Sequence, residues 1–255
     1  MQLALSNLSF IGFESNQLIN LPKDLGLEIF YEFGNDLYWH TLLKQLFSDH
    51  APHSLSLHGP CIATNLADPN DNHYLVQYKQ ALDFAAKWQA NFIVVHTNEA
   101  FTGDKRSTQN LVKDRITELV ALANNYPVQL VIENVGLCNK NTLLFDWNDY
   151  WDLIQAFPTV GALLDTGHAH INGWQMPRVI YDLGPRLKAC HLHDNHGQTD
   201  AHLPIGLGII PWQSLFTALQ TSCPDASLIF EYAHVELKTA LANIQTITKK
   251  YSIEY

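Results

Sequence analysis

Residues 189–208 read ACHLHDNHGQTDAHLPIGLG. This stretch opens as a short apolar strand and ends in a turn-forming run that contains Pro204, Gly206 and Gly208. Between them stand His191, His193, Asp194, His196, Asp200 and His202. This density of imidazole and carboxylate is typical of a metal site, although a histidine-rich surface loop would have the same composition. The choice depends on whether further ligand-type residues stand in matching positions elsewhere.

Length and composition indicate one domain, residues 1–255, because no linker, charge run or repeat divides the chain. The four cysteines (Cys61, Cys138, Cys190, Cys223) form no C-x-x-C pair. They predict neither a disulfide framework nor a thiolate zinc site, and they favour a reducing, cytoplasmic location. The N-terminus reads as a first strand rather than a signal peptide, and no segment reaches membrane-spanning length.

The net charge of −10 argues against a nucleic-acid partner. Binding along a phosphate backbone needs clustered cations, and the Lys and Arg residues here are dispersed. Lys105 and Arg106 could hold a substrate phosphate, but a solvated loop pair is the favoured interpretation. Lys140 and Arg178 occupy comparable loops and leave the same two possibilities open. A small-molecule partner is therefore expected, and the oligomeric state is not determined by the sequence.

Short apolar runs alternate with amphipathic stretches along the whole chain. The predicted strands are Leu3–Phe10, Leu27–Phe33, Ser54–His58, Phe92–His96, Val128–Glu133, Val160–Asp165, Leu187–His193 and Ser227–Glu231. The predicted helices are Asp36–Ser48, Asn72–Gln89, Ser107–Asn124, Trp147–Ala156, Trp212–Gln220 and His234–Lys250. Eight such strands in about 250 residues predict an α/β fold, a closed (β/α)8 barrel, rather than an open doubly wound sheet.

Polar ligand-type residues stand at the carboxyl ends of six predicted strands. They are His58, His96, Glu133, Asp165, His191 and Glu231, with His168, Asp200 and His202 in the loops beyond. In a barrel all eight carboxyl ends meet on one face, so these side chains should converge there. One such residue alone could be a hydrogen-bonded rim residue, but several carboxylates in one cleft would repel one another without a cation. The pattern predicts a metal-binding pocket.

With these residues at its strand ends, the chain resembles the xylose isomerase-like TIM barrels. That group contains sugar isomerases, ketose 3-epimerases and the endonuclease IV type of nuclease. The motifs that carry the resemblance are SLSLHGP (54–60), VVHTN (94–98), VIEN (131–134), LLDTGHAH (163–170), HLHDNHGQTDAHLPIGLG (191–208) and IFEY (229–232). They cover the third to the eighth strand, and the first two strands carry little of the resemblance.

The resemblance to the epimerases implies one divalent metal held by Glu133, Asp165, His191 and Glu231. It also implies that Glu133 and Glu231 face opposite sides of a substrate carbon and exchange its proton, while His168 contacts a substrate oxygen. This chemistry is sound, because a metal that polarises a carbonyl lets flanking carboxylates remove and return a proton. One departure is that the ketose epimerases carry an arginine shortly after the seventh-strand histidine, where this chain reads DNHG.

The resemblance to the nucleases implies up to three zinc ions. His58, His96 and Glu133 would hold the first, the four epimerase-type ligands the second, and His168, Asp200 and His202 the third. The ion is expected to be zinc or manganese, one to three per chain, because the histidine set favours zinc and the four-residue core accepts manganese.

The favoured function is a metal-dependent isomerase or epimerase of a sugar or sugar phosphate. A multinuclear zinc phosphodiesterase or small-phosphoester hydrolase is the alternative, because it would use the same cluster. Two readings outside this chemistry stay open: a catalytically inactive sensor that binds a sugar or nucleotide fragment, and a barrel in which ions only stabilise the fold. His193 and Asp194 are expected to orient the metal ligands.

Overall fold

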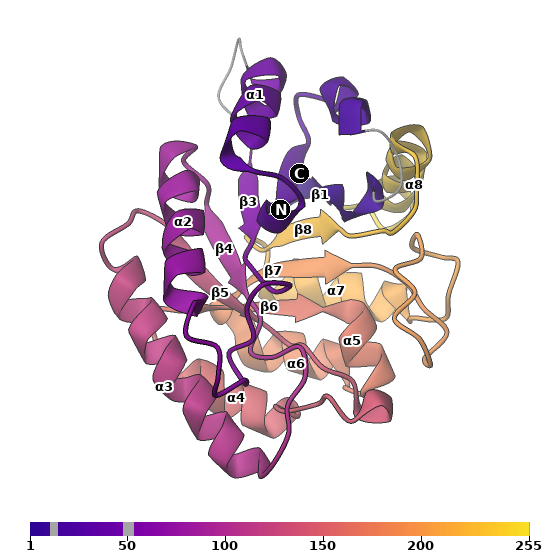
Figure 1. The fold of residues 1–255 in the computed structure, drawn as a ribbon. Helices are drawn as coiled ribbons and strands as arrows, with labels where there is room; N and C mark the ends of the chain where they lie inside the picture. The colour runs from indigo at the N-terminus through magenta and orange to yellow at the C-terminus, as the bar shows by residue number, and fades with distance from the viewer. Residues whose placement is uncertain (11–14, 48–53, 255) are drawn as a thin grey trace.

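The computed structural model describes residues 1–10, 15–47 and 54–254. Eight parallel strands close into a barrel, in which each strand pairs with the next along the chain and the last pairs with the first (Figure 1). They are β1 (Gln2–Ser6), β2 (Gly26–Phe30), β3 (Leu55–His58), β4 (Phe92–Val95), β5 (Gln129–Glu133), β6 (Gly161–Asp165), β7 (Leu187–Leu192) and β8 (Ser227–Phe230). The predicted fold, a single (β/α)8 barrel domain, is confirmed.

Helices surround the barrel and cover the outer faces of the strands (Figure 1). They are α1 (Asp36–Leu46), α2 (Tyr74–Lys87), α3 (Lys105–Ala123), α4 (Trp147–Ala156), α5 (Thr166–Ile171), α6 (Met176–Leu183), α7 (Trp212–Ser222) and α8 (Leu237–Lys250). Short 3-10 helices are η1 (Asn7–Phe10), η2 (Ser15–Asn20), η3 (Tyr31–Phe33), η4 (Cys138–Lys140) and η5 (Gly184–Arg186). In the described part of the chain, no helix combines the length and apolarity needed to cross a bilayer.

Two apolar cores follow from the alternation of side chains along each strand. One lies between the strands and the helices and contains residues such as Leu5, Ile93 and Ile132. The other fills the barrel interior and consists of Ala4, Phe92, Val94, Val131, Leu163, Ala189 and Ile229. Several of these interior residues stand two positions before a ligand-type residue, as Val131 does before Glu133. The interior core therefore forms a floor beneath the polar mouth.

Several predicted element boundaries were wrong. The first two predicted strands are too long, because 7–10 and 31–33 form η1 and η3. The fourth, seventh and eighth strands end one residue before the predicted His96, His193 and Glu231. Side-chain periodicity continues past the last backbone pairing, so it cannot show where the ladder stops. The sequence reading also missed α5 and α6, of six and eight residues, which are too short for a helical period to stand out.

Three helices begin at other residues than predicted, and for α3 the reason is a capping residue upstream of the apolar pattern. Helix α3 begins at Lys105 rather than Ser107, since the Asp104 carboxylate accepts a hydrogen bond from the Ser107 backbone N–H. Helix α2 is two residues shorter than predicted at each end, α7 ends two residues later, and α8 begins three residues later. The predicted end of the first helix at Ser48 lies outside the described residues.

Candidate metal centre

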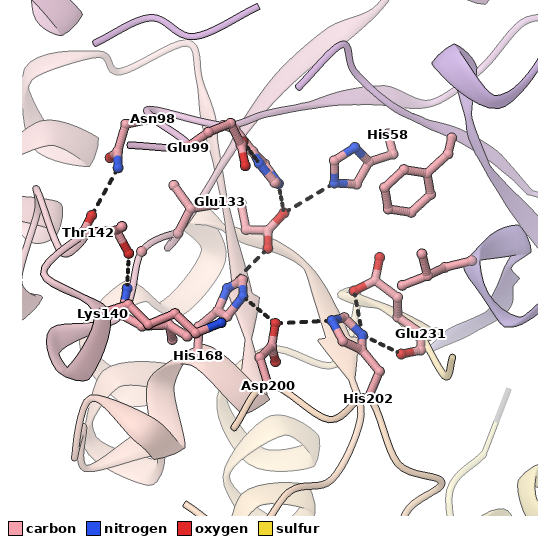
Figure 2. Close-up of a pocket in the computed structure, with 16 residues that line it drawn as sticks. His58, Asn98, Glu99, Glu133, Lys140, Thr142, His168, Asp200, His202 and Glu231 are labelled. Carbon is pink, nitrogen blue, oxygen red and sulfur yellow. Dashed lines mark hydrogen bonds and ion pairs between the residues drawn. The ribbon is translucent and has the colours of Figure 1, made fainter. Parts of the chain in front are cut away.

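The strand ends deliver ligand-type side chains to one cavity of about 310 Å³ (Figure 2). Seven of the nine predicted residues line it: His58, His96, Glu133, His168, Asp200, His202 and Glu231. The other two, Asp165 and His191, are fully buried against these lining residues. Part of the remaining wall is apolar and comes from Leu8, Phe30, Val135 and Leu137. Loops and strand ends far apart in the sequence therefore meet at one point, as the barrel topology predicts.

Glu133, at the end of β5, is the hub of the cluster. Its Oε2 lies 3.0 Å from His96 Nε2 and 3.7 Å from His58 Nε2. The same oxygen lies 3.5 Å from His191 Nδ1, and Oε1 lies 3.5 Å from His168 Nδ1. Four imidazoles thus converge on one carboxylate that is 2% exposed. No other carboxylate in the described residues has ion-pair contacts with four histidines.

Contacts on the far side of two rings aim them at this hub. His96 Nδ1 lies 2.6 Å from Glu99 Oε1. His58 Nδ1 lies 3.1 Å from the Gly59 carbonyl oxygen, and its ring stacks on Phe30 with centroids 3.8 Å apart. Because each Nδ1 has its own acceptor, each Nε2 faces Glu133.

Asp165, the last residue of β6, connects the strand to helix α5. One of its oxygens accepts the His168 backbone N–H at 2.6 Å and caps the helix, while the other lies 2.9 Å from His193 Nε2. The neighbouring Asn134 receives the Asp165 N–H on its side-chain oxygen at 2.7 Å, and its carbonyl lies 3.1 Å from His168 Nδ1. His193 thus contacts a ligand-type residue directly, and it also stacks on His202 at 3.9 Å.

Asp200 and His202 come from the long loop after β7. Asp200 Oδ2 lies 3.1 Å from both His168 Nε2 and His202 Nε2. His202 Nδ1 lies 2.9 Å from the Glu231 carbonyl oxygen. The His202 backbone has a φ of +43°, which is costly for a residue with a side chain, and its carbonyl is anchored by the Ala233 N–H. The loop is therefore held in a strained form that points this imidazole into the mouth.

Asp194 acts on the ligand-type residues through the loop backbone rather than by direct contact. It contacts none of the ligand-type residues; its carboxylate accepts hydrogen bonds from the backbone of Asn195, Gly206 and Ile210 and from the Trp212 indole. A Cβ at Gly208 would lie 2.3 Å from Asp194 Oδ1. The L-P-x-G-x-G tail is thus a scaffold that closes the loop around one buried carboxylate, and this closure places Asp200 and His202.

One residue of the cluster was missed entirely by the sequence reading. Glu28, in the middle of β2, is fully buried, and its Oε1 lies 2.8 Å from His191 Nε2. Its Oε2 accepts the Ser56 hydroxyl at 2.9 Å. The available signal was a carboxylate inside the apolar run GLEIF, which buries all five of its residues.

The donor set fits a cation. Four buried polar atoms around the cavity have no hydrogen-bond partner: His191 Nδ1, His193 Nδ1, Asp200 Oδ1 and Glu231 Oε1. Such atoms are costly unless something binds them. Several groups of three residues each offer ligand atoms that all lie within 4.8 Å of one another. One of these groups is Glu133, Asp165 and His191. Cys61, which the sequence analysis did not assign to a metal site, joins His58 and His96 in one of these groups.

Electrostatics separate the two glutamates of the mouth. Burial opposes ionisation of Glu133, but His96 and His191 outweigh it and hold its pKa well below the usual range. For Glu231 burial dominates over His191 and His202, and the pKa rises to about 8. Burial also opposes charge on His96 and His202, yet the surrounding carboxylates raise their pKa values to about 10 and about 9. A divalent cation would favour carboxylate and neutral imidazole, so it would lower the pKa values of Glu231, His96 and His202 and keep Glu133 ionised.

Cations are scarce at the mouth. Lys105 forms ion pairs with Asp149 at 2.8 Å and Asp146 at 3.6 Å. Arg178 forms an ion pair with Asp182 at 2.8 Å. Both cations therefore take part in ion pairs on helix surfaces. Among the described residues that line the cavity, Lys140 is the only lysine or arginine. The described surface thus offers no basic groove at this site.

Comparison with known proteins places the chain in one family. Residues 11–250 match the family model described as "Xylose isomerase-like TIM barrel". A curated relative, the uncharacterized protein MJ1614 of Methanocaldococcus jannaschii, is 26% identical over 159 residues. That alignment spans 61% of this chain and 61% of the relative.

Solved structures share the fold over nearly the whole chain at low sequence identity. A D-tagatose 3-epimerase-like protein has a TM-score of 0.81 at 19% identity, covering 99% of this chain and 97% of that one. The IOLI protein with a bound zinc atom has a TM-score of 0.79 at 15% identity, covering 98% and 99%. D-psicose 3-epimerase from Clostridium cellulolyticum H10, solved with D-tagatose, has a TM-score of 0.73 at 16% identity, covering 100% of both chains. With the family model matching residues 11–250, the chain belongs to the xylose isomerase-like TIM barrel family.

Proposed function

We propose that this protein is a divalent-metal-dependent isomerase or epimerase of a sugar or sugar phosphate. The observation that carries the proposal is the pair of glutamates, Glu133 on β5 and Glu231 after β8, which face one small cavity (Figure 2). Their Oε2 atoms lie 3.5 and 3.4 Å from the same nitrogen, His191 Nδ1. Two carboxylates around one point are what proton removal and return at a single carbon require.

The proposed holders of the metal are the nine residues of the predicted set. Glu133, Asp165, His191 and Glu231 would hold a central ion. His58 and His96, with Glu133, would hold a second, and His168, Asp200 and His202 a third; zinc or manganese is the expected ion. When bound, the cation would polarise a substrate carbonyl and the adjacent hydroxyl and so acidify the C–H bond between them.

The two glutamates are assigned the proton transfers. The carboxylate on one side of the substrate carbon takes the proton, and the carboxyl on the other side returns one to the opposite face. In the metal-free protein Glu133 is ionised while burial raises the pKa of Glu231 to about 8, and a bound cation would favour the carboxylate form of both. His168 has one nitrogen toward Glu133 and one toward Asp200, and we assign it the contact with a substrate oxygen.

The surroundings favour a small substrate over a polymer. A volume of about 310 Å³ is at the lower end of the usual range for small-molecule sites. A phosphodiester backbone would need roughly six to ten cationic contacts, whereas the described lining offers one lysine. Lys140 suffices for one phosphate or carboxylate group on a sugar. The free cysteines fit a cytoplasmic setting.

Hydrolysis of a small phosphoester is the second candidate. Two groups of residues beside the central carboxylates support it. His58 and His96 lie on one side, and Asp200 and His202 lie on the other. Closely spaced metals bound by nitrogen and oxygen ligands suit in-line displacement at phosphorus. A ligand-binding sensor or a barrel with purely structural ions would use the same ligands without turnover.

Isotope exchange distinguishes these functions. The metal-loaded protein is incubated with a panel of keto-sugars and sugar phosphates in deuterated water. We expect deuterium to enter the carbon beside the carbonyl and the exchange to fall about 100-fold or more in Glu133→Gln and Glu231→Gln. No exchange with any sugar, together with cleavage of a model phosphodiester or an abasic-site duplex, would reverse the ranking. Neither reaction, with tight sugar binding, would indicate a sensor.

A further inference from the structure

We propose that Glu28 is a positioning residue for the metal centre. It holds His191 in the tautomer that carries its proton on Nε2, so that the bare Nδ1 is presented to the cation. This inference rests on the proposed metal site, but not on the identity of the reaction.

The contact crosses the interior of the barrel. Glu28 belongs to β2 and His191 to β7, two strands that are not neighbours in the sheet. Both residues are 0% exposed, and Glu28 Oε1 lies 2.8 Å from His191 Nε2. A carboxylate buried this deeply is costly unless protein groups hydrogen-bond to it, and His191 on the far strand is one such partner.

The second oxygen of Glu28 is also engaged. Ser56, the residue paired with Glu28 on the adjacent strand β3, donates its hydroxyl to Oε2 at 2.9 Å. With both oxygens accepting hydrogen bonds, the carboxylate cannot rotate, and the imidazole N–H that it accepts is fixed in direction. Ser56, Glu28 and His191 thus form one chain of hydrogen bonds.

The other nitrogen of the ring shows what this orientation achieves. His191 Nδ1 lies 3.4 Å from Glu231 Oε2 and 3.5 Å from Glu133 Oε2, and it has no hydrogen-bond partner. A proton fixed on Nε2 leaves the Nδ1 lone pair directed at the point where these carboxylates meet. A carboxylate that accepts the other N–H of a metal-binding imidazole also makes the imidazole more basic, and so a stronger ligand for the metal.

Glu28 could instead be a metal ligand itself, because one group of closely spaced ligand atoms contains Glu28, His191 and Glu231. The geometry argues against this alternative. Glu28 approaches His191 from the Nε2 side, whereas Glu133, Asp165 and Glu231 all approach from the Nδ1 side. An ion bound on the Nδ1 side is therefore separated from Glu28 by the imidazole ring.

The test measures tautomer and metal affinity rather than turnover. In zinc-loaded protein labelled with ¹⁵N-histidine, we expect His191 to keep its proton on Nε2 while Nδ1 carries none. Glu28→Gln should retain the fold and weaken zinc binding about 10- to 100-fold in chelator competition. Glu28→Ala should weaken binding at least as much, and Ser56→Ala should have a smaller effect because it frees only one oxygen.

Glu32→Gln is the matched control. Glu32 lies four residues further along the same segment, and its carboxylate accepts backbone N–H groups of Cys61, Ile62 and Ala63 rather than an imidazole. We expect this variant to shift the melting temperature but to leave the His191 tautomer unchanged and zinc affinity within about threefold of wild type.

Two outcomes would overturn the proposal: a His191 proton on Nδ1 in the wild type, or zinc affinity in Glu28→Gln within about twofold of wild type. If Glu28→Ala fails to fold, the tautomer in wild type and the affinities of Glu28→Gln and Ser56→Ala still decide. Failure of the proposed reaction would look different, because sugar exchange would be absent while zinc binding still depended on Glu28.

Discussion

The centre of the mouth and its two flanks are built differently. The central residues Glu133, Asp165, His191 and Glu231 are at most 3% exposed and stand at or next to strand ends. On the flanks, the side chains of His96, His168, Asp200 and His202 are 13–18% exposed, whereas His58, the last residue of β3, is buried like the centre. The barrel itself places the centre, whereas loops and single hydrogen bonds place much of the flanks. Rigid elements hold ligands more accurately than loops, so the centre should bind metal first and most tightly.

The strongest challenge to this comparison is removal of a central ligand. We expect His191→Ala and Asp165→Ala to weaken metal binding by about 100-fold or more and to abolish isotope exchange, because the flanks cannot replace a buried ligand. Metal content after dialysis and calorimetric titration measure the effect. His196→Ala, an exposed histidine of the same stretch, should behave as wild type. Unchanged metal content in both central variants would contradict the assignment.

Flank variants should produce a partial loss. His58→Ala, His96→Ala and His202→Ala are each expected to lower the number of bound ions by up to one per chain while the central ion remains. Atomic analysis of protein dialysed against limiting zinc provides the count. If the wild type binds one ion and these variants still bind one, the flanks contact substrate instead, and only kcat and KM should change.

Metal removal tests the whole centre at once. A ligand present at about 1,000 times its dissociation constant stabilises the native state by about 4 kcal/mol, which corresponds to roughly 10 °C in melting temperature for a chain of this size. Thermal melts with and without a chelator measure the difference, and re-addition of zinc should restore it. A chelator effect below about 2 °C would indicate that no resident ion stabilises the fold.

The pH dependence should differ between the apo and metal-loaded forms. In the apo protein the pKa of His202 is raised to about 9 and that of His96 to about 10, above the usual 6.5. The stability these groups contribute is therefore fully present below pH 6.5 and is lost as the pH rises through 9 to 10.

Zinc competes with the same protons, so its affinity should rise over that interval. Melts and zinc titrations from pH 6 to 10 test both trends, and His202→Gln should flatten the apo curve. An apo stability that stays constant from pH 6.5 to 10 would argue against charged imidazoles in the empty centre.

The smallest expected effect concerns the rim rather than the centre. Lys140→Met should raise KM for a sugar phosphate about fivefold, equivalent to about 1 kcal/mol, because an exposed cation is screened by solvent. KM for the corresponding unphosphorylated sugar should change less than twofold. Lys105→Met is the control, since its ion pairs with Asp146 and Asp149 lie away from the cavity. Equal effects on both sugars would remove Lys140 from phosphate recognition.

The sequence alone determined the architecture and nine residues of the cluster, although not Glu28. Alternating apolar runs and amphipathic stretches predicted the closed barrel, because a closed parallel sheet needs a returning helix after each strand. The same topology forces the strand ends together, so nine residues spread from His58 to Glu231 could be assigned to one mouth. The sequence also showed that the Lys and Arg residues are dispersed rather than clustered.

Only the tertiary structure decided which atoms face each other. The link from Glu28 to His191 spans 163 positions and crosses the barrel, and no periodicity along β2 indicates its partner. Asp194 stands next to ligand-type residues in the sequence, yet its carboxylate accepts hydrogen bonds from backbone N–H groups. Those of Gly206 and Ile210 come near it only in the folded loop. The local alternation of apolar and polar residues indicates which face of a strand a side chain occupies. Its hydrogen-bond partners depend on strand stagger and loop closure, which are set by the packing of the whole barrel.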